Sequence, residues 1–192
     1  MTDGLWIFGY GSIMWKTGFD YEEVHLAYVN GRSRRFWQGS MDHRGTVDAP
    51  GRVVTLIEMP GEDCWGMAFK IPAKSIDATL LALDHREIGG YSREIIAISF
   101  PSGQTIEGLT YNAHRENPNF LGDAPINSIA MQIAVSHGPS GSNKEYILEL
   151  EKVLNHHKVK DEHVLNVAKQ VKQIAERKTF YENYRRTRCS KT

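Results

Sequence analysis

The chain of 192 residues has little cysteine, no net charge and no long hydrophobic segment. Its two cysteines, Cys64 and Cys189, lie in no CxxC or Cys/His spacing, so we expect reduced thiols rather than a metal or redox site. Lys plus Arg total 23 and Asp plus Glu total 23, which leaves no overall charge to attract nucleic acid or an anionic membrane. A small, specific ligand is the expected partner.

Targeting and membrane segments are not expected either. Asp3 stands where a secretory leader carries positive charge, and Gly9 and Gly11 interrupt the apolar stretch around them. No segment approaches the roughly 18 consecutive apolar residues of a membrane span. We therefore expect a cytoplasmic protein that does not contact a membrane.

The usual nucleotide, metal and hydrolase motifs are missing. The glycines near the N-terminus do not have the spacing of GxGxxG or GxxxxGK[ST], and the histidines form no HExxH. No GxSxG elbow surrounds Ser12 or Ser40, which argues against an α/β-type serine hydrolase. We expect neither a metal nor a cofactor.

Strand patterns dominate the first half of the chain. Residues 5–8 form a short apolar run that ends in glycines, and alternation predicts half-buried strands at residues 53–57, 65–71 and 96–100. Residues 60–63 (PGED) predict a hairpin-like connection between two of these strands.

Helical spacing appears between strands and then dominates. It follows Pro72 up to Gly89-Gly90, follows Pro125, and follows Ser142, which has a capping-box spacing with Glu145. Residues 164–175 add a further helix. Strands gathered early and helices late predict the α+β class, with a small, curved, mostly antiparallel sheet. We expect one domain over residues 1–192, with a flexible basic tail after about residue 178.

The turn Gly9-Tyr10-Gly11-Ser12 is the first candidate site. Glycines allow backbone amides to approach a ligand and to point several N–H groups into one concavity, which suits a carboxylate or an oxyanion. Ser12 adds a hydroxyl. A glycine-rich turn without a ligand explains the pattern at least as well.

The second candidate is Glu87, at the end of the helix predicted from residue 76. A carboxylate near a helix C-terminus feels the negative end of the backbone dipole, and burial raises its pKa further, so Glu87 could act as a general base. A surface ion pair of Glu87 with Arg86 or Arg93 is the more common outcome for such a residue.

The third candidate is the polar and aromatic run over residues 34–45. Arg44 could receive a substrate carboxylate through a bidentate fork. A stacked cluster of arginine and aromatic side chains that only fixes a loop is an equal alternative.

Several strings together resemble the ChaC-type glutathione-specific γ-glutamylcyclotransferases. They are WIFGYGSIMW at 6–15, SRRFWQGSMDHRGTVDAPGRVVTL at 33–56, LDHREIGGY at 83–91, GPSG at 138–141 and NKEY at 143–146. The resemblance covers residues 6 to about 154. Ile13 and Ile88 stand where the family often has Leu and Lys.

The resemblance implies a small β-barrel with flanking helices and cofactor-free conversion of glutathione to 5-oxoproline and cysteinylglycine. It makes Glu87 the catalytic base and places Tyr146 near the substrate. The residues that would hold the γ-glutamyl group are Ile7, Phe8, Gly9, Tyr10, Gly11 and Ser12. A cyclotransferase for other γ-glutamyl peptides or amines, and a non-catalytic γ-glutamyl-binding module, are the alternatives.

Overall fold

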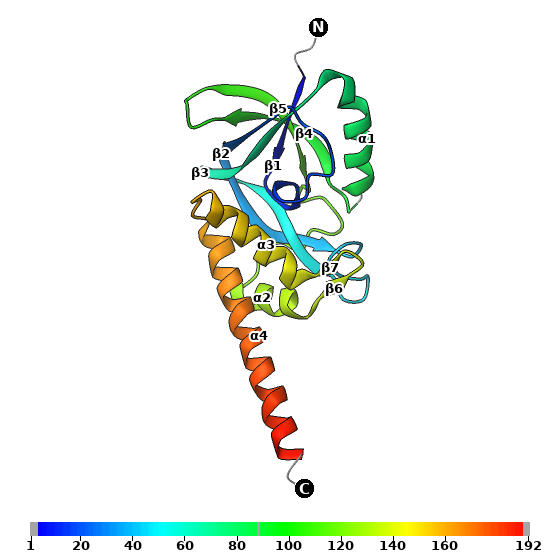
Figure 1. Cartoon of the computed structure of the whole chain (residues 1–192), viewed down its shortest axis with the longest axis vertical. Coiled ribbons are helices and arrows are strands. Elements are labelled where there is room, and N and C mark those ends of the chain that lie inside the picture. The colour runs from blue at the N-terminus through cyan, green and yellow to red at the C-terminus, as the bar shows by residue number, and fades with distance from the viewer. Residues whose placement is uncertain (1–3, 88, 190–192) are drawn as a thin grey trace.

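A computed structural model describes residues 4–87 and 89–189 of the chain (Figure 1). The strands are β1 (Leu5–Gly9), β2 (Glu23–Ser40), β3 (Gly51–Ile71), β4 (Ser92–Ser99), β5 (Thr105–Asn112), β6 (His137–Gly138) and β7 (Gly141–Ser142). The helices are α1 (Ile76–Arg86), α2 (Ile126–Val135), α3 (Asn143–His156) and α4 (Glu162–Cys189), with short 3-10 turns η1 (Ser12–Met14) and η2 (Ala73–Ser75).

Five strands close into a barrel in the order β1-β3-β2-β4-β5. All neighbouring pairs are antiparallel except β1 with β5, which run parallel where Ile7 faces Leu109. The short strands β6 and β7 pair only with each other. The prediction of a small, mostly antiparallel barrel with helices is therefore confirmed.

Strand β3 departs from the sequence prediction in two ways. Residues 60–63 do not form a hairpin, because the segments on both sides of them pair with the same strand, β2. Residues 59–62 instead form an excursion opposite Gly31, within one strand of 21 residues. The expected half-burial of residues 53–57 is also wrong, since helices α2 and α3 contact β3 and residues on both of its faces are buried.

The helices gather at two places around the barrel (Figure 1). Helix α1 lies against β4 and β5, where Tyr111 donates a 2.7 Å hydrogen bond to Asp84 and Arg93 forms an ion pair with Asp84. Helices α2, α3 and α4 contact one another and lie together at one end of the barrel (Figure 1). The predicted cap of α3 is present, because the Ser142 hydroxyl accepts a 3.1 Å hydrogen bond from the Glu145 N–H.

Helix α4 extends further than the sequence predicts. Val164, Val167, Ala168 and Val171 are fully buried, whereas the helix continues to Cys189 and projects away from the barrel (Figure 1). The segment expected to be a tail after about residue 178 is thus helical up to Cys189.

No helix within the described part of the chain is both long enough and apolar enough to cross a membrane.

Removing the α3 cap tests this description of the fold. Ser142→Ala should lower the free energy of unfolding by about 1 kcal/mol, the usual cost of losing an N-cap hydroxyl. Ser128→Ala is the control, because Ser128 is exposed in the first turn of α2 and its hydroxyl has no hydrogen-bond partner among the described residues. Urea denaturation of both variants measures the difference, and equal stability of the two would contradict the cap.

Candidate active site

The glycine turn leads directly out of the barrel. Strand β1 ends at Gly9, and η1 follows at once, with Ile13 and Met14 buried. A Cβ atom at Gly9 would lie 2.7 Å from Cγ2 of Ile13, so a larger residue does not fit there. A Cβ atom at Gly11 would lie 3.0 Å from the Tyr146 hydroxyl, which shows how closely the backbone of the turn approaches that side chain.

Arg86 ties the end of α1 to the glycine turn. Its Nη2 donates to the Ser12 hydroxyl at 2.8 Å, and its Nη1 donates to the carbonyls of Lys16 at 2.6 Å and Thr17 at 2.8 Å. Glu87 follows as the C-cap of α1, with its N–H bonded to the Leu83 carbonyl at 2.8 Å. The glycine turn and Glu87 are therefore fixed relative to each other.

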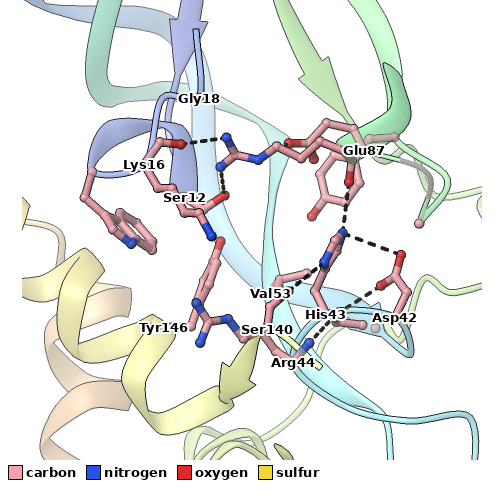
Figure 2. A pocket seen from close by; sticks show the side chains of 16 residues that line it. Ser12, Lys16, Gly18, Asp42, His43, Arg44, Val53, Glu87, Ser140 and Tyr146 are labelled. Carbon is pink, nitrogen blue, oxygen red and sulfur yellow. Dashed lines mark hydrogen bonds and ion pairs between the residues drawn. The ribbon is translucent and has the colours of Figure 1, made fainter. Parts of the chain in front are cut away.

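Two adjoining cavities lie between these segments. The outer cavity, of about 280 Å³, opens between the end of α1, the loop after β2 and the start of α3 (Figure 2). The inner cavity, of about 40 Å³, lies against the glycine turn. Both cavities are lined by Ser12, Glu87, Tyr91 and Tyr146. The glutamate thus stands where the two cavities meet.

Burial controls the protonation of Glu87. The side chain is 16 % exposed, and this loss of solvent raises the pKa of the carboxyl above its ordinary value. Arg86, whose Nε lies 3.5 Å from Oε1 of Glu87, and His43 act in the opposite direction, while Asp42 raises the pKa further. The sequence-based alternative of an ion pair with Arg86 is therefore also present, but inside the cavity. Arg93, the other proposed partner, pairs with Asp84.

Three tyrosines surround Glu87 as neutral phenols. Burial is the main cause that raises the pKa values of Tyr10, Tyr91 and Tyr146. Tyr91 donates a 2.6 Å hydrogen bond to the Val54 carbonyl, and Tyr10 donates a 2.9 Å bond to the Tyr111 carbonyl. The wall of the inner cavity is consequently uncharged apart from Glu87.

Arg44 makes the contacts of the loop-fixing alternative, and it also lines the outer cavity. Its guanidinium lies 5.8 Å from the centre of the Tyr146 ring, and its Nη1 donates to Glu145 at 3.0 Å and to the Ser142 carbonyl at 3.1 Å. These bonds hold the start of α3. Arg44 is also 9 % exposed and lines the outer cavity, so the rest of its guanidinium is placed to meet a ligand there.

His43 and Asp42 complete the wall beside Glu87. Both lie in the candidate run over residues 34–45, but reasoning from the sequence gave a role in that run to Arg44 alone. His43 bonds the Arg86 carbonyl through Nε2 at 2.9 Å and the Ser140 hydroxyl through Nδ1 at 3.1 Å. Because a carbonyl only accepts, Nε2 carries the proton. His43 therefore connects the loop after β2 to the end of α1, as Figure 2 shows. Its position in the string shared with the family was the available signal.

The structure brings most of the candidate residues together, but not all. Phe8, Gly9, Tyr10, Gly11, Ser12, Glu87 and Tyr146 line the inner cavity. Arg44 lines the outer cavity. Ile7 lines neither of them, and its side chain is buried in the barrel core.

Metal ligands do not gather in this part of the molecule. Within the described residues, no group of three or more His, Cys, Asp or Glu side chains is arranged to hold a metal ion. Cys64 is buried in the core, where loss of solvent raises the pKa of its thiol to about 11, so it remains protonated.

Comparison with known proteins identifies the family. A family model described as "ChaC-like protein" matches residues 5–174. The chain belongs to the ChaC-like family. It is 44 % identical over 151 residues to a zebrafish (Danio rerio) protein named glutathione-specific gamma-glutamylcyclotransferase 1, covering 76 % of each chain. It is 42 % identical over 178 residues to gamma-glutamylcyclotransferase 2-3 of Arabidopsis thaliana, covering 88 % of this chain and 89 % of that protein.

The solved structures support the fold of this ChaC-like protein. A crystal structure of a γ-glutamyl cyclotransferase specific to glutathione from yeast superposes with a TM-score of 0.84 at 28 % identity, covering 90 % of this chain and 97 % of that one. The resemblance seen in the sequence, and the barrel that it implied, are confirmed.

The raised pKa of Glu87 predicts a stability cost. Because the folded state favours the neutral carboxyl, ionisation destabilises the protein above the ordinary pKa of a glutamate, and the cost is absent below it. At pH 8 the free energy of unfolding of Glu87→Gln should therefore be higher than that of the wild type. At pH about 4 the two free energies of unfolding should be similar. Denaturant titrations at both pH values measure this. A wild type that is the more stable at pH 8 would show that the ion pair with Arg86 outweighs burial.

Proposed function

We propose that the protein is a glutathione-specific γ-glutamylcyclotransferase that releases 5-oxoproline and cysteinylglycine. The observation that carries this proposal is the carboxylate of Glu87 at the junction of two cavities, facing a backbone turn rich in glycine. The naming of its relatives for the same reaction supports it.

The two cavities divide the substrate between them. The γ-glutamyl group lies toward the inner cavity, against the glycine turn and under Tyr10 and Tyr146. The cysteinylglycine part extends into the outer cavity, whose lining includes the cations Lys16, Arg44 and Arg86, and we assign a substrate carboxylate to Arg44. The scissile amide then lies beside Glu87, where the cavities meet.

Glu87 carries the proton through the reaction. Its carboxylate takes a proton from the substrate α-amine, and the amine nitrogen attacks the γ-carbonyl carbon of the same molecule. The new C–N bond closes a five-membered ring, and backbone N–H groups of Gly11 and Ser12 stabilise the negative oxygen. When the tetrahedral carbon collapses, its bond to the cysteinyl nitrogen breaks and Glu87 returns the proton to that nitrogen.

The protein contributes mainly geometry, because nucleophile and electrophile belong to one molecule. Holding the substrate folded brings the amine within reach of the γ-carbonyl and supplies much of the rate. The raised pKa of Glu87 suits both of its tasks, since a stronger base takes the proton more readily at neutral pH. None of these steps uses a covalent enzyme intermediate.

Glu87→Gln tests the proposed function directly. It keeps the size of the side chain and removes the proton carrier, so turnover of glutathione should fall by about 10²–10⁴-fold while the fold is kept. Glutathione, γ-Glu-Cys and γ-Glu-Ala are each incubated with both proteins, and 5-oxoproline is quantified. A near-wild-type rate for the variant would disprove the role of Glu87, and preference for γ-Glu-Ala would disprove the assigned substrate.

Asp42 should tune the pH dependence of the reaction. Its negative charge raises the pKa of Glu87, so Asp42→Asn should lower that pKa and move the acidic limb of kcat to lower pH. Asp77→Asn is the matched control, because Asp77 is exposed in the first turn of α1, about 15 Å along the helix axis from Glu87. Rate profiles from pH 5 to pH 9 compare the two variants. An unmoved limb in Asp42→Asn, or an equal shift in both, would contradict the assignment.

A further inference from the structure

Arg34 is a buried arginine that the proposed reaction leaves without a role. It lies in β2, with its side chain 0 % exposed. Its Nη1 donates to the carbonyl of Tyr10, its Nη2 donates to the carbonyl of Trp65, and its Nε donates to Oδ2 of Asp161 at 3.1 Å. An arginine taken fully out of water is costly unless its donors are paired. These three bonds, with a 3.5 Å contact from Nη1 to the Met14 sulfur, occupy four of its five N–H donors.

The hydrogen bond from Arg34 to the Tyr10 carbonyl fixes the glycine turn just beyond the last residue of β1 that pairs with β3. Gly9, opposite Met67, is the last residue of β1 in register with β3, so Tyr10 lies beyond the paired part of the strand. Its carbonyl is buried and points to the guanidinium of Arg34. Arg34 thus fixes the plane of the peptide group that joins Tyr10 to Gly11.

Because the Tyr10 carbonyl and the Gly11 N–H belong to the same peptide group, fixing the carbonyl also fixes the direction of that N–H. In a planar trans peptide, the carbonyl of one residue and the N–H of the next point in opposite directions. Gly11 lines the inner cavity, whereas Arg34 lines a separate cavity of about 270 Å³ that shares no residue with the two active-site cavities. The N–H of Gly11 consequently points away from Arg34, and within the described residues it has no hydrogen-bond acceptor.

We propose that Arg34 is a positioning residue that keeps the Gly11 N–H turned into the inner cavity, where it stabilises the oxyanion on the γ-carbonyl. Its positive charge also polarises the peptide group that it holds, which makes the Gly11 N–H a stronger donor. This inference rests on the proposed function.

Asp161 holds Arg34 in place and connects it to α4. While Oδ2 of Asp161 accepts from Arg34, its Oδ1 accepts from the Val164 N–H at 3.0 Å and its carbonyl accepts from the Leu165 N–H at 2.9 Å. The first turn of α4 is therefore linked through Asp161 and Arg34 to the glycine turn. This gives the C-terminal helix a part in the geometry of the active site without any contact with the substrate.

The test compares Arg34→Lys with Arg52→Lys. Lysine keeps the charge of Arg34 but cannot reach the two carbonyls and Asp161 together. Arg52 is the matched control, because it is 7 % exposed and its Nη1 also holds two backbone carbonyls, those of Phe36 at 2.9 Å and Gly122 at 3.3 Å, away from both active-site cavities.

Arg34→Lys should lower kcat for glutathione by between about 10-fold and about 10³-fold, the upper limit being the loss of one oxyanion donor. KM should change much less, because the lost interaction belongs to the transition state. Arg52→Lys should keep kcat. Calorimetric titration with glutathione, in a Glu87→Gln background that prevents turnover, should give one site per chain for both lysine variants.

Several outcomes would overturn the inference. The inference fails if Arg34→Lys has the kcat of the wild type. It also fails if kcat falls only in proportion to the number of glutathione-binding sites per chain, because a purely structural role of Arg34 predicts that result. Should Arg34→Lys not fold, the amide resonance of Gly11 in Glu87→Gln decides: it should move to lower field when glutathione is added, and an unmoved resonance refutes the inference. If the wild type releases no 5-oxoproline from glutathione, the proposed function itself is wrong and this inference falls with it.

Discussion

The active site depends on the hydrogen bonds that the Arg86 side chain makes to the glycine turn and the residues after it. The glycine turn leaves the barrel at β1, and Glu87 ends a helix that follows β3, so no single element carries both. Three hydrogen bonds from Arg86 to Ser12, Lys16 and Thr17 join them. Proton transfer requires heavy atoms within about 2.6–3.2 Å of each other, and a shift of one ångström costs rate. The hydrogen bonds of Arg86 therefore determine whether the Glu87 carboxylate can reach a substrate held by the glycine turn.

The same arginine also limits how far burial can change Glu87. Its Nε lies 3.5 Å from the carboxylate and favours the ionised form, while burial and Asp42 favour the neutral form. The balance leaves the pKa raised, which gives a base that can accept a proton from an amine and later return it. Such a group reduces stability in the absence of substrate, as is common for residues placed for function.

Local signals explain which parts of the fold were predictable. Prolines, glycines and residue periodicity located β1, α1, α2 and the capped start of α3, because these signals act over a few neighbouring residues. The continuity of β3 across residues 59–62 was not predictable in this way, since it depends on both halves pairing with β2. The burial of both faces of residues 53–57 likewise depends on helices that come later in the chain.

The site shows the same division between local and distant information. Glu87 and the glycine turn could be nominated from helix ends and glycine spacing, but their proximity could not. Ile7 entered the list as part of the turn string, whereas the structure places its side chain in the core. His43 and Arg86 act by hydrogen bonding to backbone carbonyls of distant segments. Such contacts produce no recognisable spacing of residues along the sequence.

In the proposed reaction the substrate's own amine, rather than water, attacks the γ-carbonyl. Mass spectrometry of a glutathione digest run in ¹⁸O-labelled water tests this most directly. Attack by the amine should yield 5-oxoproline and cysteinylglycine without the label, because no water oxygen enters either product. Glutamate with one ¹⁸O atom in its γ-carboxyl group would show hydrolysis instead and would rule out attack by the amine.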